Sequence, residues 1–258
     1  MWHAESRGSG PDLVLVHGWG MHSGIWSEWA DRLAHRFRVH LVDLPGHGRS
    51  GPAAGSSLDD WSAAVAAQVP ERAWWLGWSL GGLVALNTVR LLPDRVCGLV
   101  LVASTPRFVT APDWPSAVDP EVFKQFSGQL RQSVDRTLSR FLSLQIRGSD
   151  GSGDLLRGLR AALQERPYPA PEALIDGLKI LQRTDLRNSL SGIEVPLYWL
   201  FGERDTLVPA PVAERVPGVR ECVAGAGHAP FLSHPDTCTA CIDAWLLRAS
   251  RAGRHAAG

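Results

Sequence analysis

The sequence Gly77-Trp78-Ser79-Leu80-Gly81 fits the pattern G-x-S-x-G, and it constrains the chain more than any other feature. Apolar, strand-like residues precede it from 72 to 76, and a helical pattern follows it from 82 to 89. A turn this sharp between a strand and a helix strains the backbone of its central residue and needs glycine on both sides. We therefore predict a nucleophile elbow. In it the Ser79 hydroxyl lies at the carboxyl edge of a sheet, beside the free N–H groups of a helix N-terminus.

Composition places the chain among ordinary globular enzymes. Apolar residues make up 45% of the 258 residues and charged residues 20%, and the formal net charge is zero. A neutral chain does not favour nucleic-acid binding driven by bulk charge. The N-terminal residues lack the apolar core of a signal peptide, and no apolar run is long enough to span a membrane. We therefore expect a cytoplasmic protein that binds neither nucleic acid nor membrane.

The cysteines and histidines do not suggest a redox motif or a metal site. Cys238 and Cys241 form C-x-x-C on an amphipathic helical pattern without a second pair, so we interpret the four cysteines as buried or idle thiols. None of the nine histidines has the spacing of an H-E-x-x-H zinc site. We expect neither a metal nor a cofactor.

Strand and helix signals alternate along the first third of the chain. Runs of apolar residues predict strands that are buried on both faces, and the segments between them have helical spacing. This alternation is typical of an α/β fold: a mostly parallel sheet with helices on both faces, which binds ligands at the carboxyl ends of its strands. Strands are predicted at 12–16, 37–43, 72–76, 96–103, 195–201 and 220–223, and helices at 26–37, 58–69, 82–89 and 235–249.

The alternation stops after Ser104. Residues 108–188 have helical periodicity broken by Gly, Pro and Ser clusters, which predicts a helical cap, or lid, inserted over the strand ends. The sheet-forming core then consists of residues 1–107 and 189–250. Residues 251–258 are expected to form a disordered tail.

Two later loops offer catalytic partners for Ser79. A serine hydroxyl is a poor nucleophile until a histidine, itself oriented by a carboxylate, takes its proton. Asp205 follows the strand that returns after the cap, and His228 follows the last predicted strand in a glycine-containing loop. The chain order Ser, Asp, His is the one this architecture requires. Glu203 is a rival acid and His234 a rival base, and we interpret His234 as structural.

An oxyanion hole requires a second N–H group from the loop after the first predicted strand. That loop is His17-Gly18-Trp19-Gly20, so the backbone N–H groups of Trp19 and Leu80 are the predicted donors. The Trp19 side chain would then line the acyl pocket. We interpret His17 as a residue that braces its loop, and the turn-rich segment 43–50 as structural bracing.

Together these segments resemble the α/β-hydrolase superfamily over nearly the whole chain. The resemblance is carried by the loop 17–20, the segment 43–50, the elbow, and the loops around Asp205 and His228. It implies a core with an inserted cap and a Ser-His-Asp triad.

A narrower resemblance is to the carboxylesterases that hydrolyse the methyl ester of pimeloyl-acyl carrier protein in biotin synthesis. It rests on the tryptophans that flank the elbow and on residues 15–20, 40–46, 75–85, 140–145 and 226–235. The substrates implied are acyl carrier protein bearing the pimeloyl methyl ester, and small-molecule esters. We further expect a monomer. The resemblance also implies that substrate contacts Trp19, Ser79, Leu80, Phe141, Leu142, Ser143, Leu144, Gln145 and His228.

The predicted cap has a two-sided helix of its own. On a helix from Val134, one face could close over an apolar acyl chain, while the opposite face could meet solvent or an anionic partner. The first face carries Leu138, Phe141, Leu142 and Gln145, and the second carries Arg136 and Arg140.

Basic residues are concentrated in the same part of the cap. Seven arginines and four acidic residues between 131 and 166 give a local net charge of +3. We expect Arg136, Arg140, Arg157 and Arg160 to form a docking patch for the acidic carrier protein. The alternative is a solvated helix face in an arginine-rich protein. The glycine-rich stretch 148–153 replaces a more helical stretch that the resemblance implies, and it leaves the positions of Arg157 and Arg160 open.

The sequence therefore predicts a serine carboxylesterase. A broad short-chain esterase and a C–C bond hydrolase on the same scaffold are the alternatives among enzymes. A non-catalytic ligand-binding protein is the alternative from a different class, because a fold does not fix a function.

Overall fold

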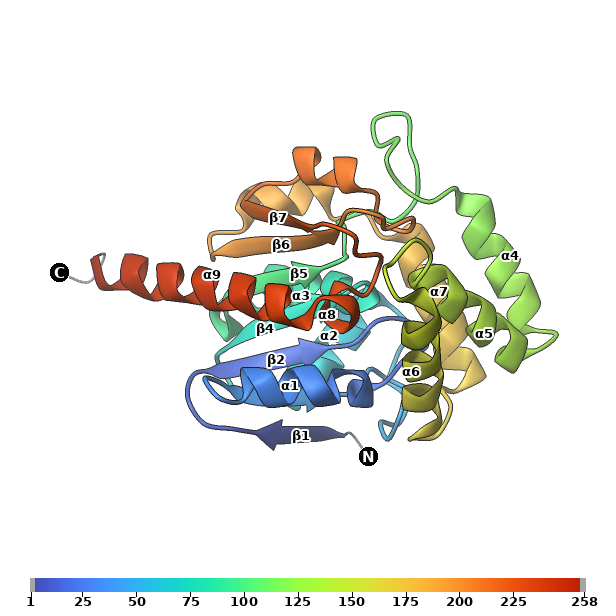
Figure 1. Cartoon of the computed structure of the whole chain (residues 1–258), viewed down its shortest axis with the longest axis horizontal. Helices are drawn as coiled ribbons and strands as arrows, with labels where there is room; N and C mark the ends of the chain where they lie inside the picture. The colour runs from blue at the N-terminus through green and yellow to red at the C-terminus, as the bar shows by residue number, and fades with distance from the viewer. Residues whose placement is uncertain (1–2, 256–258) are drawn as a thin grey trace.

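A seven-stranded sheet forms the centre of the computed structural model, which describes residues 3–255 (Figure 1). The strand order is β1-β3-β2-β4-β5-β6-β7, and every neighbouring pair is parallel except β1 with β3. The strands are β1 (Ala4–Arg7), β2 (Asp12–Val16), β3 (Arg38–Val42), β4 (Ala73–Trp78), β5 (Val96–Val102), β6 (Leu197–Gly202) and β7 (Val219–Val223).

Helices cover both faces of this sheet, and their apolar sides complete the core. In Figure 1, α1 and α9 lie in front of the sheet, and α2 and α3 lie behind it. The helices of the core are α1 (Ser27–Leu33), α2 (Leu58–Ala66), α3 (Leu80–Leu91), α8 (Pro230–Ser233) and α9 (Pro235–His255), with 3₁₀ turns η1 (Ser23–Trp26), η2 (Pro93–Arg95), η3 (Arg187–Gly192) and η4 (Ala210–Arg215).

The burial of the strands follows their place in the sheet. β6 is buried along its whole length, as the parallel strands of a sheet covered on both faces must be. β7 is an edge strand, and four of its five residues are exposed. The other edge strand, β1, lacks an apolar run and was missed in the sequence, because its pairing with β3 comes from tertiary contacts rather than from its own pattern.

The segment between β5 and β6 forms a helical cap. In Figure 1 it lies beyond the arrowheads of the parallel strands, over their carboxyl ends. The Leu186 N–H group donates to the carbonyl of Pro106, so the inserted segment leaves and rejoins the core at one place. Its helices are α4 (Pro120–Leu130), α5 (Val134–Gln145), α6 (Ser152–Gln164) and α7 (Pro171–Arg183).

The predicted α/β architecture is confirmed, with one correction at the C-terminus. The expected disordered tail began at residue 251, but α9 continues to His255. Alanine and arginine are good helix formers, so the helix that begins at Pro235 has no local reason to stop at 250. Residues 256–258 of the predicted tail lie outside the described residues.

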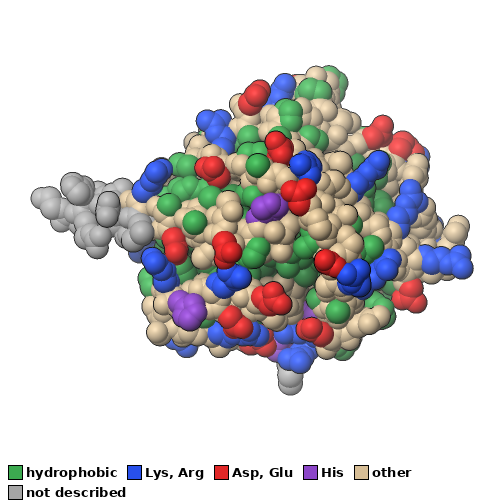
Figure 2. Space-filling view, viewed as in Figure 1, with side chains coloured by type: hydrophobic (Ala, Val, Ile, Leu, Met, Phe, Trp, Pro, Cys, Tyr) green, Lys and Arg blue, Asp and Glu red, His purple; other side chains and the backbone are tan. Residues whose placement is uncertain are grey.

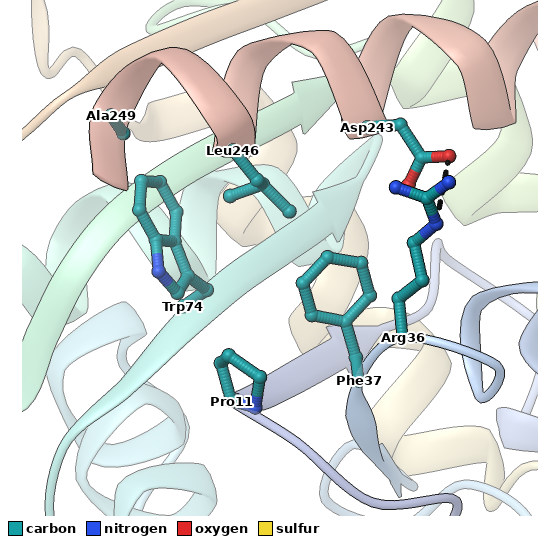
Figure 3. Close-up of a pocket in the computed structure, with 7 residues that line it drawn as sticks. All are labelled: Pro11, Arg36, Phe37, Trp74, Asp243, Leu246 and Ala249. Atoms are coloured by element: carbon teal, nitrogen blue, oxygen red, sulfur yellow. Dashed lines mark ion pairs between the residues drawn. The ribbon is translucent and has the colours of Figure 1, made fainter. Parts of the chain in front are cut away.

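The end of the strands opposite the cap carries a groove of about 280 Å³ beneath α9 (Figure 3). Its floor is apolar, and Arg36 and Asp243 form an ion pair at its rim, with 3.5 Å between Nε and Oδ2. Parallel sheets bind substrates at the carboxyl ends of their strands, so this groove lies at the wrong end of the strands for catalysis.

Within the described residues, no helix combines the length and the apolar character that crossing a bilayer demands.

A buried ion pair joins the cap to the core. The Arg166 guanidinium, which follows α6, lies 3.2 Å from the Asp43 carboxylate after β3, and the two side chains are 7% and 0% exposed. Asp43 also accepts hydrogen bonds from the backbone N–H groups of Ser23 and Arg49. One carboxylate therefore holds the base of the cap, the start of η1 and its own loop together.

Replacing Arg166 with leucine should destabilise the fold by about 3 kcal/mol, because the Asp43 carboxylate would stay buried without its cation. The free energy of unfolding from urea titrations measures the change. Lys124→Gln removes an exposed cation that pairs with Glu121 on α4 and should change that energy little. An equal, small effect of both substitutions would contradict the anchoring role of Arg166.

Candidate active site

Close packing at the elbow forces an unusual backbone at Ser79. Its φ and ψ are 54° and −118°, in a region that non-glycine residues rarely adopt. A Cβ atom on Gly77 would overlap the carbonyl of Gly81, and one on Gly81 would overlap the carbonyl of Val16. The strand, the turn and α3 can approach one another only because these residues lack side chains.

Residues at and just after the end of β5 hold the strained turn in place. The Ser79 N–H group donates to the Val102 carbonyl over 3.0 Å, and the Ser104 hydroxyl donates to the Ser79 carbonyl over 2.9 Å. Ala103, between them, also has a positive φ of 43°. Sequence reasoning missed Ser104. The available signal was its position at the carboxyl end of a buried strand, where parallel sheets form their sites.

Ser79, His228 and Asp205 form one hydrogen-bonded chain. The distance from Ser79 Oγ to His228 Nε2 is 2.8 Å, and that from His228 Nδ1 to Asp205 Oδ2 is 2.7 Å. A carboxylate only accepts hydrogen bonds, so Nδ1 carries the proton and Nε2 accepts from the serine hydroxyl. The other Asp205 oxygen accepts from the N–H groups of Leu207 and Val208, which fixes the carboxylate.

The rival acid and base lie elsewhere. Glu203 accepts a hydrogen bond from the Gly225 N–H group over 2.9 Å, so it braces the histidine loop instead of contacting the imidazole. The His234 ring contacts the Ser233 hydroxyl at 2.8 Å. This contact agrees with the structural interpretation of His234.

The backbone N–H groups of Trp19 and Leu80 are the predicted oxyanion donors. Leu80 is the first residue of α3, and among the described residues neither N–H group has a protein acceptor. The Trp19 indole donates to the Leu174 carbonyl of α7 over 2.8 Å, and Gly177 gives the indole room, because a Cβ there would lie 2.7 Å from Trp19 Cδ1. The predicted oxyanion donors are thus placed at the start of a helix and beneath the cap.

His17 braces the oxyanion loop, as predicted. Its Nδ1–H donates to the Gly18 carbonyl, and its Nε2 accepts from the Leu44 N–H group over 2.9 Å. Burial, together with the neighbouring His47, lowers the pKa of His17 to about 3. Burial lowers the pKa of His47 to about 4. Both rings are therefore neutral and structural at neutral pH.

The cap helix α5 contributes unequally to the site. The Phe141 ring meets the Trp19 ring edge-on at 4.6 Å between centroids, and the Gln145 carbonyl accepts a hydrogen bond from the His228 N–H group. Ser143 and Leu144, which the resemblance placed at the substrate, line a groove between α4 and α5. At about 100° per residue, Ser143 faces away from Phe141, whereas Leu144 lies about 60° from Phe141 and packs partly against the core. Leu142 is buried on the inner side.

The site is closed in this structure. Ser79 is 2% exposed and His228 is 1% exposed, and Trp19, Leu80 and Gln145 are wholly buried. An ester can contact the Ser79 hydroxyl only after residues of the cap have moved. Neither end of the Gln145 amide has a hydrogen-bond partner among the described residues, so both can serve a molecule that enters.

Fold and site together define the class of protein. A serine on a strained strand-to-helix turn, a histidine that can accept its proton and a carboxylate behind the histidine form the arrangement of a serine hydrolase. A sequence model described as the alpha/beta hydrolase family matches residues 13–240, and this chain belongs to that family.

Curated relatives of high similarity share one activity. A pimeloyl-[acyl-carrier protein] methyl ester esterase from Xanthomonas axonopodis pv. citri is 48% identical over 240 residues, which are 91% of this chain and 94% of the relative. One from Stenotrophomonas maltophilia is 44% identical over 257 residues, 97% of this chain and 98% of the relative. Its similarity to these relatives shows that the chain is a carboxylic ester hydrolase.

Solved structures share the fold at lower identity. An esterase from Exiguobacterium antarcticum matches with a TM-score of 0.83 at 21% identity, covering 95% of this chain and 94% of that one. A bromoperoxidase from Bacillus anthracis matches with a TM-score of 0.84 at 20% identity, covering 95% of each chain. The same architecture thus carries differently named activities, and these structures establish the fold alone.

The buried histidines predict how stability depends on pH. An unfolded histidine has a pKa near 6.5, so below that pH the unfolded chain protonates these histidines. In the folded protein His17 and His47 stay neutral until a much lower pH, because their pKa values are lowered. The free energy of unfolding should fall between pH 6.5 and 4, by about 1.4 kcal/mol per pH unit for each of the two. His47→Gln should remove about one histidine's share of this slope in urea titrations at several pH values. His35→Gln, at an exposed position, should leave the slope unchanged. An unaltered slope in the His47 variant would contradict the assignment.

Proposed function

We propose that this chain hydrolyses the methyl ester of pimeloyl-acyl carrier protein, giving pimeloyl-acyl carrier protein and methanol in biotin synthesis. The hydrogen-bonded chain from Ser79 through His228 to Asp205 carries the chemical part of the proposal. The curated relatives, at 43–48% identity over most of their length, support the choice of substrate.

In the first half of the reaction, the enzyme is acylated. His228 Nε2 takes the hydroxyl proton of Ser79 as Oγ bonds to the ester carbonyl carbon. The carbonyl oxygen becomes an oxyanion, which the N–H groups of Trp19 and Leu80 stabilise. The bond from carbon to methoxy oxygen then breaks, and His228 gives its proton to that oxygen, so methanol leaves.

In the second half, water releases the acid. His228 takes a proton from a water molecule as the water oxygen attacks the acyl carbon, and the bond to Ser79 Oγ breaks with return of the proton to the serine. Throughout, the Asp205 carboxylate holds the imidazole in the required tautomer and stabilises its cation. The reaction balances with one water molecule, and no step calls for a metal or a cofactor.

The acyl chain would lie between the core and α5. Trp19 and Phe141 offer aromatic surface to the methylene groups, and the unpaired amide of Gln145 offers both a donor and an acceptor. We assign these residues, with Leu80 and the inward-facing Leu142, to substrate binding.

The four arginines of the predicted docking patch are exposed on the cap. Arg136 and Arg140 lie on α5, and Arg157 and Arg160 lie on α6. Arg140 packs over the Phe126 ring at 5.5 Å, and Arg157 pairs with Asp154. Figure 2 shows basic side chains gathered along the right-hand margin, over the cap. An acidic carrier protein is the partner that such a surface would attract.

Ser79→Ala should lower kcat for ester hydrolysis by about 10⁴-fold or more, because the nucleophile is removed. Wild type should restore growth without biotin to a bacterium that lacks its own pimeloyl-ester esterase, and the variant should not. An unchanged circular dichroism spectrum and melting temperature would show that the variant is folded. Substantial turnover by a folded Ser79→Ala variant would contradict the mechanism.

A fluorophosphonate probe separates the enzyme from a non-catalytic binding protein of the same fold. Wild type should be labelled at Ser79, and the Ser79→Ala variant should not. Absence of labelling in wild type would favour the binding protein. Labelling and p-nitrophenyl ester hydrolysis without rescue of growth would indicate a broad esterase.

The double variant Arg136→Glu with Arg140→Glu should lower kcat/KM for the carrier-bound ester by about tenfold or more, because the changes repel an acidic partner. Hydrolysis of a small p-nitrophenyl ester should stay within about twofold of wild type, since both arginine side chains are exposed whereas Ser79 is buried. Parallel loss on the two substrates would mean that the arginines support the fold and do not dock the carrier.

A further inference from the structure

The segment that ends α5 and follows it, residues 145–150, is hydrogen-bonded to the loop that carries His228. The Gln145 carbonyl accepts from the His228 N–H group over 3.0 Å, and the Ser149 hydroxyl accepts from the Gly227 N–H group over 2.9 Å. The Asp150 N–H group donates to the Gly225 carbonyl over 3.2 Å. Three hydrogen bonds therefore join the cap segment 145–150 to the loop segment 225–228.

Ser149 makes the only side-chain contact among these three bonds. It is 8% exposed, and a Cβ atom on Gly227 would overlap its hydroxyl oxygen. Gly227 thus lacks a side chain where the serine approaches its backbone. The Gly227 N–H group lies next to His228 in sequence and is buried, so it has to be paired.

The same segment also reaches the loop of the acid. The Arg204 guanidinium donates to the Gly148 carbonyl over 3.2 Å and to the Asp150 carboxylate over 2.7 Å. Arg204 is next to Asp205 in sequence, and its N–H group donates to the Ala226 carbonyl. The glycine-rich stretch after α5 therefore contacts the acid loop and the histidine loop at once.

We propose that Ser149 is a positioning residue for His228, an inference that rests on the proposed serine-hydrolase function. On one side of His228, the Trp78 indole donates to its carbonyl over 2.7 Å from the elbow strand. On the other side, its N–H group and that of Gly227 are held by the cap segment. The imidazole is aimed at Ser79 by bonds from both the core and the cap, and among the three bonds from the cap segment, that of Ser149 is the one that a side-chain change can remove.

The glycines of the loop explain why this bond matters for turnover. The loop contains Gly225, at a φ of 73°, and Gly227, and glycine restrains the backbone least. Without the Ser149 hydroxyl, the Gly227 N–H group would seek another acceptor and the loop would shift. Small displacements of a general base slow proton transfer while leaving the binding surface at Trp19 and Phe141 unchanged.

The test compares Ser149→Thr with Ser149→Val, which have nearly the same volume and differ in the hydroxyl, and adds Ser149→Ala. On a p-nitrophenyl ester, kcat should fall about tenfold or more in the Val and Ala variants, with KM within about twofold of wild type. The Thr variant should keep most of the wild-type kcat. The rate of fluorophosphonate labelling at Ser79 should follow the same order.

Ser139→Ala is the matched control, because Ser139 lies exposed on α5, outside the segment 145–150 that is bonded to the catalytic loops. It should leave kcat and KM unchanged. Wild-type kcat in the Val and Ala variants, or a Thr variant as slow as the Val variant, would overturn the positioning role. Loss expressed in KM alone would overturn it too. A wild-type protein that neither hydrolyses the ester nor reacts with the probe would refute the proposed function itself.

Discussion

The crowding around the elbow is the constraint on which the rest of the site depends. Gly77 and Gly81 let β4, α3 and the end of β2 meet without side chains between them, and Ser79 takes its strained conformation as a result. That one contact places the serine hydroxyl at the sheet edge and brings the Leu80 N–H group next to it. It also fixes where β6 and β7 must deliver their loops, because Asp205 and His228 have to reach the same point.

The cap supplies the remaining contacts that hold the site residues on the sheet. Its α7 accepts the Trp19 indole, its α5 ends on the His228 N–H group, and Arg166 anchors its base to Asp43. A site built in this way excludes water when closed, which strengthens every hydrogen bond to a developing oxyanion. The same arrangement links the entry of substrate to the alignment of the catalytic residues, because the cap that covers Ser79 also holds the loop that carries His228.

The sequence predicted the parts of the molecule in which local pattern and chemistry agree. The buried strands and the elbow follow from residues close together in the chain, and the order Ser79, Asp205, His228 is the one that this architecture requires. β1 could not be predicted, because Ala4–Arg7 has no strand pattern and forms a strand only by pairing with β3. Ser104 and Ser149 act through contacts between residues distant in the sequence; the position of Ser104 after a buried strand placed it near the site, but a single sequence does not identify the partner of either residue.

The close approach of α7 to Trp19 limits how such caps can recombine during evolution or in the laboratory. The Leu174 carbonyl and the bare backbone of Gly177, three residues later, form a matched surface for one indole ring. A foreign cap grafted between β5 and β6 would have to present a free carbonyl and a glycine with the same spacing and orientation. The insertion is contiguous in the gene, yet it is not an interchangeable module, and chimeras that ignore this pair should lose the ordered Trp19 ring first.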